Sequence, residues 1–371
     1  MTMLKDVKVL DLTRQLPGPY CTWTLSKLGA EVLRIEDPEG EDLVRAYPAM
    51  YEIINAGKKS MTLNLKKSSG RKIFLDLVSK SDVLVEGFRP GVMDKLELSY
   101  ETLREYNEKI IYCSISGYGQ NGPYRDVVGH DINYMSICGL LGINGTPESP
   151  IIPGMQIGDI GGGIFGALSI LASLYKMGVN GEGEYIDVSM MDVLSSFFSI
   201  AAPEFCYYEE STPERGRMLL TGLFPCYNIY KAKDGKFISL GANEPKFWNN
   251  FCLRINRADL VQRQLDTSAI EEVKKIFLEK TREEWVEMFK GIDSCLAPIY
   301  DPEETLNDLQ INYRKVFDRK RKILNLPVKF LKGKIKEGRK APEKGENTSE
   351  ILKTLGYKER NIEDLKGEKV I

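Results

Sequence analysis

Near its N-terminus the chain reads Lys8-Val9-Leu10-Asp11-Leu12, then a helical pattern over residues 19–28, then Glu31-Val32-Leu33-Arg34-Ile35. The two apolar runs are short enough for strands, and the pattern between them repeats with helical spacing. A strand, a helix and a second strand in this order are typical of a parallel β-α-β unit.

The same alternation continues downstream. Residues 61–65 are typical of a short strand, residues 83–85 and 110–113 are near-continuous apolar runs, and residues 70–80 form a helical pattern. Near-continuous apolar strands are expected where helices cover both faces of a parallel sheet. The sequence therefore predicts an α/β fold built on a large, open, parallel-sheet (Rossmann-like) domain. The first strand–helix turn, residues 13–19, is not G-x-G-x-x-G, and the chain has no P-loop, so ordinary dinucleotide or nucleoside-triphosphate chemistry is unsupported.

A chain of 371 residues predicts two domains. Around residue 210 the pattern changes to a β-hairpin over residues 227–240, followed by helices over residues 245–253 and 282–290. We expect a smaller α+β domain at 210–305, and a large domain made of 1–209 and a returning part, 306–371, which ends in a helical tail. The stretch 314–344 holds 13 Lys and Arg against three acidic residues, which fits either a solvated linker or a patch for ligand phosphates.

Composition excludes several classes of protein. The 51 basic and 53 acidic residues nearly cancel, which argues against a dedicated nucleic-acid binder. The first residues are charged and lack the apolar core of a signal peptide, so none is expected. The apolar run 160–175 is short for a membrane span, so we expect a buried helix there. Seven cysteines without a C-x-x-C pair suit a reducing, cytoplasmic location. With one histidine and no acidic cluster at ligand spacing, no metal site is expected.

One candidate site follows a predicted strand. Gly117-Tyr118-Gly119-Gln120-Asn121-Gly122-Pro123 leads to Gly129-His130-Asp131-Ile132-Asn133-Tyr134. Ligands of open α/β sheets bind at the carboxyl ends of the strands, where this loop is expected. Asp131 is a suitable N-cap for a helix through Met135, Ile137 and Leu140, which places His130 at the helix start, where the helix dipole favours neutral imidazole. The alternative is a capping histidine without chemistry.

A second candidate is Gly158-Asp159-Ile160-Gly161-Gly162-Gly163, at the start of the apolar helix. Asp159 is either an N-cap or a carboxylate held ionised by backbone N–H groups, ready to act as base or nucleophile. Glycines in a first helical turn cost roughly 1 kcal/mol each relative to alanine. They indicate close approach to a ligand or to another element.

These motifs resemble the family III CoA-transferase superfamily (CaiB/BaiF type). The resemblance rests also on Arg14 with Pro17-Gly18-Pro19, on Glu86-Gly87-Phe88-Arg89-Pro90-Gly91-Val92, and on later segments at 241–248, 293–298 and 345–348. It covers essentially the whole chain. Within the superfamily, Gly-His-Asp-Ile-Asn-Tyr is similar to the α-methylacyl-CoA racemase branch.

The resemblance implies an acyl-CoA thioester as substrate, no separate cofactor and an interlocked homodimer. It implies that His130 and Asp159 flank the substrate's α-carbon, with Glu244 close by. Racemases often have an arginine where this chain has Asp37, so the phosphate contact expected there passes to Lys58, to Lys59 or to the stretch 314–344. CoA or substrate contacts are expected at Asp37, Lys59, Thr62, Leu63, Asn64, Leu65, Arg89, Gly129, Asp131, Ile132, Asn133 and Tyr134.

Two reactions suit these residues. Inversion of the acidic α-carbon of a 2-methylacyl-CoA needs a base on each face, served by neutral His130 and ionised Asp159, with backbone N–H groups of the two helix starts stabilising the enolate. The alternative is a CoA transferase, in which Asp159 attacks the thioester carbonyl and His130 has no task. A non-catalytic CoA-binding relative would be expected to lack one of the two residues.

Overall fold

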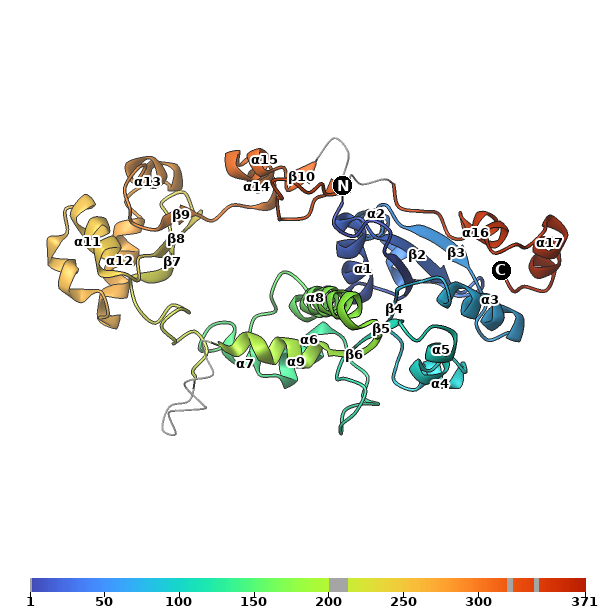
Figure 1. The fold of residues 1–371 in the computed structure, drawn as a ribbon. Coiled ribbons are helices and arrows are strands. Elements are labelled where there is room, and N and C mark those ends of the chain that lie inside the picture. The colour runs from blue at the N-terminus through green and yellow to red at the C-terminus, as the bar shows by residue number, and fades with distance from the viewer. Residues whose placement is uncertain (1, 200–212, 319–322, 337–339) are drawn as a thin grey trace. The chain divides into compact units, whose positions relative to one another are not determined.

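The computed structural model describes residues 2–199, 213–318, 323–336 and 340–371, which fall into two compact units (Figure 1). The first unit comprises residues 1–138, 153–198 and 313–371, and the second comprises 139–152 and 199–312. Segment 139–152, which the sequence analysis placed in the large domain, belongs to the second unit. There Arg215 donates hydrogen bonds to the carbonyls of Gly142, Thr146 and Pro147.

The first unit is built on a six-stranded parallel sheet with the order β3-β2-β1-β4-β5-β6. Val9 pairs with Val32 on one side and with Val83 on the other, so the strand order reverses between β1 and β4. Such a reversal opens a crevice at the carboxyl ends of the two strands. The predicted α/β fold with a smaller α+β unit is confirmed. The strands are β1 (Lys8–Leu12), β2 (Glu31–Glu36), β3 (Lys59–Thr62), β4 (Val83–Glu86), β5 (Ile111–Ser116) and β6 (Glu184–Ser189).

Helices cover both faces of this sheet, which explains its apolar strands. Leu10, Leu84 and Tyr112 pack with residues of α3 and α5 in one hydrophobic cluster. Ile115 points to the other face and contacts the glycines of α8. The helices are α1 (Pro17–Leu28), α2 (Pro48–Ile54), α3 (Ser68–Val78), α4 (Val92–Lys95), α5 (Tyr100–Tyr106), α6 (Asp131–Ile137), α8 (Ile157–Asn180), α9 (Met190–Ser196), α16 (Thr348–Thr354) and α17 (Glu359–Gly367); short elements are η1 (Leu43–Ala46), η2 (Phe197–Ser199), β10 (Phe317–Asp318) and β11 (Ile323–Leu324).

Two predicted elements end earlier than expected. The strand predicted at 61–65 is β3, Lys59–Thr62, because the chain turns away after it and the Asn64 N–H donates to the carbonyl of Val370. The helix predicted through Leu140 ends at Ile137, because Gly139 takes a left-handed φ of 91°.

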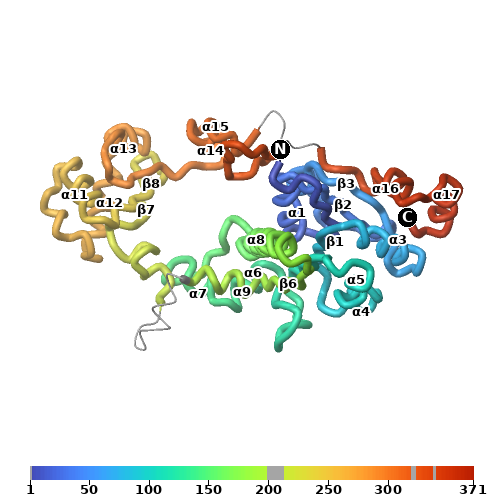
Figure 2. The backbone as a smooth tube through the Cα atoms, viewed as in Figure 1, coloured from blue at the N-terminus to red at the C-terminus, as the bar shows by residue number. Residues whose placement is uncertain are grey.

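The C-terminal residues from 313 onward belong to the first unit, whereas the sequence analysis began the returning part at residue 306. The Thr62 N–H donates to Thr348 Oγ1 at 3.1 Å, and Leu352, Ile362 and Val370 join the core that contains Leu63. Helices α16 and α17 consequently lie beside β3 and α3 (Figure 2). The C-terminal helices thus complete the outer edge of the sheet.

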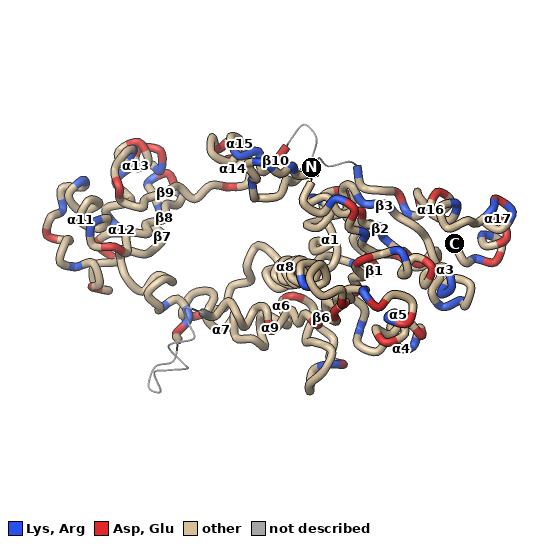
Figure 3. Tube along the Cα trace, in the orientation of Figure 1, with Lys and Arg blue, Asp and Glu red and all other residues tan. Residues whose placement is uncertain are grey.

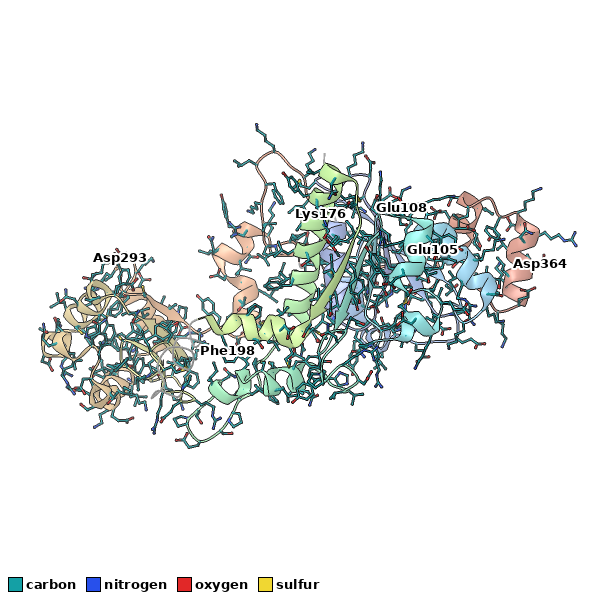
Figure 4. The ribbon with its side chains drawn as sticks, turned by 60° about the horizontal axis from the view of Figure 1, so that its bottom comes forward. Glu105, Glu108, Lys176, Phe198, Asp293 and Asp364 are labelled. Atoms are coloured by element: carbon teal, nitrogen blue, oxygen red, sulfur yellow. The ribbon has the colours of Figure 1, made fainter. Side chains whose placement is uncertain are left out.

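Helix α8 is longer than predicted, with 24 residues, and most of it is uncharged in Figure 3. Its charged residues are Asp159 in the first turn and Lys176 near the far end, of which Lys176 is labelled in Figure 4. By length and by a mean hydropathy of 1.6 it would pass for a membrane span. It packs, however, along α1 and against α9, β5 and β6. The expectation of a helix packed into the protein core is confirmed for this face.

The glycines of α8 are explained by its contacts with other elements. A Cβ at Gly163 would lie 2.7 Å from the carbonyl oxygen of Pro17 in α1, and one at Gly161 would lie 2.9 Å from Val193 in α9. Of the two causes proposed from the sequence, a ligand or another element, the structure shows the second at these positions.

This packing predicts a large difference between two glycine substitutions in one helix. Gly163→Ala is expected to destabilise the fold by about 1–3 kcal/mol, because the new methyl group meets backbone that cannot move aside. Gly178→Ala is the matched control, since a Cβ there meets nothing within 4 Å. It should stabilise α8 by up to about 1 kcal/mol. Chemical denaturation of both variants measures this, and equal midpoints would contradict the packing argument.

The second unit contains the predicted hairpin, β7 (Tyr227–Lys231) and β8 (Phe237–Gly241), extended by β9 (Leu296–Pro298) into an antiparallel sheet. Trp248, Trp285 and Tyr230 lie in its own hydrophobic core. Its helices are α7 (Leu140–Ile143), α11 (Pro245–Arg254), α12 (Ile270–Phe277), α13 (Arg282–Met288) and α14 (Pro302–Asn307), with η3 (Ala258–Arg263) and η4 (Thr267–Ala269); α15 (Leu309–Arg314) spans the boundary between the units.

Candidate active site

Arginines follow the two strands that flank the reversal of strand order. Arg14 comes after β1 and Arg89 after β4, and both side chains are exposed. The Arg14 guanidinium lies 5.7 Å from the centre of the Phe88 ring. Two cations at one sheet edge suit an anionic ligand such as a phosphate.

A buried ion pair supports the turn that carries Arg14. Asp11 accepts the N–H of Thr13 at 2.9 Å and contacts Lys58 Nζ at 3.1 Å. Burial raises the pKa of Asp11, but Lys58, Arg34 and the threonine hydrogen bonds outweigh it, so the net shift is downward. Burial lowers the pKa of Lys58 to about 8. Lys58 is fully buried within this network, so the suggestion that it contacts a phosphate is wrong.

Two other lysines, Lys66 and Lys344, lie at the Asp37 loop, where the resemblance expects an arginine. Lys66 Nζ lies 3.4 Å from the Asp37 carboxylate, and Lys59 pairs with Glu350 at 2.7 Å. Lys344 donates to the carbonyls of Pro38 and Gly40 at 3.0 and 2.7 Å. One residue of the basic stretch 314–344 therefore reaches this loop. Residues 319–322 and 337–339 of that stretch lie outside the described residues.

The expected CoA contacts after β3 are partly occupied within the unit. The Leu63 and Leu65 side chains lie in the hydrophobic core, and Asn64 Oδ1 accepts the N–H of Lys66. Thr62 faces Thr348 of α16, with 3.2 Å between the two hydroxyl oxygens. A ligand at this edge would therefore meet the backbone of 62–65 rather than the leucine side chains.

The loop after β5 is fixed at both ends and presents His130. The Gln120 N–H donates to Asp187 Oδ2 of β6 at 2.9 Å. At the other end, Tyr134 Oη donates to the carbonyl of Gly129 at 2.6 Å, and the His130 N–H donates to Asn133 Oδ1 at 3.0 Å. His130 itself is the N-cap residue of α6, and its side chain is exposed.

Asp131, predicted as that N-cap, has a different position. Its carboxylate is turned inward, with the residue 7% exposed, and Oδ1 accepts the N–H groups of Gly158 at 2.7 Å and Asp159 at 3.0 Å. The prediction that Asp131 caps α6 is wrong, because its side chain satisfies the first turn of α8 instead.

Asp159 consequently lacks the stabilisation that the sequence suggested. The N–H groups of Gly158 and Asp159 donate to the Asp131 carboxylate, and among the described residues no donor contacts the carboxylate of Asp159. Burial, and then the like charge of Asp131, raise the pKa of Asp159 to about 7. The expectation of a carboxylate held firmly ionised is therefore wrong. Its affinity for a proton is instead that of a group able to give and take one near neutral pH.

The remaining predicted residues divide between the units. Ile132 and Asn133 are exposed on α6, beside His130. Glu244 belongs to the second unit, where it is the N-cap residue of α11 and its carbonyl accepts the N–H of Phe247. The catalytic roles of His130, Asp159 and Glu244 stay predictions.

One buried group was missed by the sequence reasoning. Glu86, the last residue of β4, is 4% exposed, and burial raises its pKa to about 7. Its Oε2 accepts the Phe88 N–H at 2.8 Å. It lines a cavity of about 280 Å³ together with Arg89, Gln120 and Arg125. An acidic residue at the end of an otherwise apolar strand was the signal available in the sequence.

Residues 4–348 match the family model described as CoA-transferase family III. The chain belongs to this family. The resemblance drawn from the motifs is thereby confirmed.

Relatives of known activity include two kinds of enzyme. The α-methylacyl-CoA racemase of Mus musculus is 33% identical over 383 residues, an alignment that covers 100% of this chain and 97% of the racemase chain. The succinyl-CoA:mesaconate CoA-transferase of Haloarcula marismortui is 31% identical, covering 96% and 97%. A CaiB/BaiF family protein from Brucella suis has a similar fold, with a TM-score of 0.86, 26% identity and coverage of 95% and 99%. The chain is therefore an enzyme of the family that contains both the racemases and the CoA-transferases.

Proposed function

We propose that the protein is an acyl-CoA racemase or epimerase that inverts the α-carbon of a 2-methylacyl-CoA thioester. The α-hydrogen is weakly acidic because the carbanion delocalises onto the thioester carbonyl as an enolate. Inversion removes a proton from one face and returns another to the opposite face. His130 acts on one face and Asp159 on the other, and the reaction needs no separate cofactor.

The observation that carries this proposal is the pair formed by His130 and Asp159. They stand at the starts of α6 and α8, which Asp131 joins through hydrogen bonds of 2.7 and 3.0 Å. With a pKa of about 7, Asp159 is matched to proton transfer near neutral pH. A positioned base of this kind contributes roughly 10²–10⁴-fold to a rate.

Donors for the enolate oxygen are restricted by the same hydrogen bonds. Both helix starts were candidates from the sequence, but the N–H groups of Gly158 and Asp159 are occupied by Asp131. At the start of α6, the N–H groups of Asp131 and Ile132 have no acceptor within the part of the chain that the structure describes. We assign the enolate oxygen to these two groups, each worth on the order of 10²–10³-fold.

The CoA portion is proposed to lie along the carboxyl edge of the sheet. Arg89 and Arg14 are the exposed cations at the reversal of strand order, and Lys66 and Lys344 lie at the Asp37 loop. These charges suit the phosphates of CoA, which would take the place of water around the exposed side chains.

A CoA transferase is the second candidate, favoured by the mesaconate enzyme at 31% identity. There Asp159 attacks the thioester carbonyl and forms an anhydride that passes CoA to another acid. This reaction gives no task to the histidine beside the enolate donors. The His130 position therefore favours the racemase.

Incubation with one C2 epimer of a 2-methylacyl-CoA in deuterated water tests the proposal. Deuterium should enter at the α-carbon while the substrate becomes a near-equal mixture of the 2R and 2S epimers, without any added carboxylic acid. Turnover that requires an acceptor acid, with no α-deuterium in recovered substrate, would establish the transferase instead.

The homodimer is proposed on the exposed apolar side of α8. Ile164, Leu168, Tyr175 and Val179 are 47–78% exposed there, although the opposite side of the helix is packed. Such a patch marks an association surface. If the two chains interlock, sedimentation at nanomolar concentration should show a dimer that does not dissociate on dilution, because separation requires unfolding. A folded, active monomer would contradict this.

A further inference from the structure

The carboxylate of Asp131 lies beside the backbone of Asp159 and is turned away from solvent. The residue is 7% exposed, and Oδ1 is directed at the first turn of α8. A Cβ at Gly158 would lie 2.9 Å from this oxygen and 2.9 Å from Leu194. Glycine is therefore required at position 158 for the carboxylate to come so close to the α8 backbone.

The backbone on the other side of this contact is equally fixed. His130, the neighbour of Asp131, donates its N–H to Asn133, and its carbonyl accepts the N–H groups of Asn133 and Tyr134 at 2.8 and 3.3 Å. A single carboxylate thus connects the backbone that carries His130 with the backbone that carries Asp159. A displacement of either helix start would change the spacing of the two side chains.

We infer that Asp131 is a positioning residue that holds Asp159 opposite His130 and, through its negative charge, keeps Asp159 basic. The inference rests on the proposed two-base reaction. It assigns the side chain a task separate from the substrate contact expected at this position.

The charges around Asp159 support the electrostatic part. From α6, Asp131 and Tyr134 face it, and the negative charge of Asp159 in turn contributes to a Tyr134 pKa raised to about 12, mainly by burial. From α9 the glycine-rich turn meets apolar side chains, and from α1 it meets Pro17, Tyr20 and Cys21. Within the described residues Asp159 forms no ion pair. Asp131 is thus the charged group with the largest influence on it.

Two substitutions separate position from charge. Asp131→Asn keeps a carbonyl oxygen for the two N–H groups but removes the charge, so the acidic limb that Asp159 contributes to the pH–rate profile should move to lower pH. Asp131→Ala removes the acceptor as well, and kcat should fall by about 10²-fold with KM little changed, the cost of a displaced catalytic group. Asp126→Asn is the control, because it removes a carboxylate from the same loop that is 80% exposed. It should change neither the acidic limb nor kcat.

A titration that needs no turnover makes the outcome unambiguous. Infrared difference spectra, with Asp159→Asn subtracted, follow the protonation of Asp159 directly in wild type and in Asp131→Asn. A lower pKa in the variant supports the inference, and an unchanged pKa overturns it even if activity is lost. Absence of α-deuterium exchange in the wild type would instead refute the racemase proposal and leave the titration result standing.

Discussion

Asp159→Asn is expected to lower kcat for racemisation in both directions by about 10²–10⁴-fold, because every inversion in the proposed two-base reaction uses this carboxylate once, as base or as acid. The amide has nearly the same shape, and the N–H groups beside it are held by Asp131, so the fold and acyl-CoA binding should persist. Polarimetry that starts from each C2 epimer measures the rates. Racemisation within a few-fold of wild type would remove Asp159 from the reaction.

The pH dependence follows from the same group. With its pKa raised to about 7, Asp159 is mostly protonated at pH 5 and mostly ionised at pH 9. In the direction that begins with proton removal by Asp159, kcat should therefore rise through an apparent pKa near 7. Asp126→Asn should keep this limb, since that side chain is 80% exposed and pairs with Arg125 rather than with the start of either helix.

The pH dependence of folding stability provides an independent test of the raised pKa of Asp159. The pKa of Asp159 rises from 3.8 to about 7 on folding, so the folded state holds a proton that the unfolded state has released. Its stabilising contribution is complete below about pH 4 and is lost as the pH rises to about 7. In Asp159→Asn the side chain does not titrate, so this pH-dependent loss of stability is removed. The variant should thus gain Tm relative to wild type at about pH 8, and gain less at about pH 4.

The strand–helix pattern was sufficient to predict the sheet, because buried parallel strands leave continuous apolar runs such as Val83-Leu84-Val85. Element ends were harder to predict. The end of β3 depends on a hydrogen bond to Val370, more than 300 residues later in the chain, and no local pattern encodes it.

In the candidate site, likewise, local motifs could be predicted and contacts between distant segments could not. Local motifs located His130 and Asp159 at helix starts, since glycines and polar caps precede the apolar periodicity. The partner of Asp131 was missed because capping rules describe contacts within one helix, and this carboxylate binds the next one. The burial of Lys58 was missed for a related reason, as its partners Asp11 and Thr22 come from β1 and α1.

His130→Ala is expected to abolish measurable inversion while leaving acyl-CoA binding largely intact, because the exposed imidazole is the proposed base for one face and its backbone is fixed by Asn133 and Tyr134. Proton exchange should survive at a reduced rate on the face served by Asp159, where one base can remove a proton and return a deuteron. The substrate would then gain deuterium with its configuration retained. Such an uncoupling is specific to a two-base reaction.

The transferase predicts the opposite pattern for the same variant. His130→Ala would then have a mild effect, and hydroxylamine would trap an aspartyl intermediate at Asp159 in the wild type. Added imidazole provides the matched control, since His130 is the only histidine in the chain and no other side chain of this type can account for a recovered rate. Restored inversion with imidazole would confirm the role of His130. Racemase activity equal to wild type in His130→Ala, without imidazole, would end the two-base proposal.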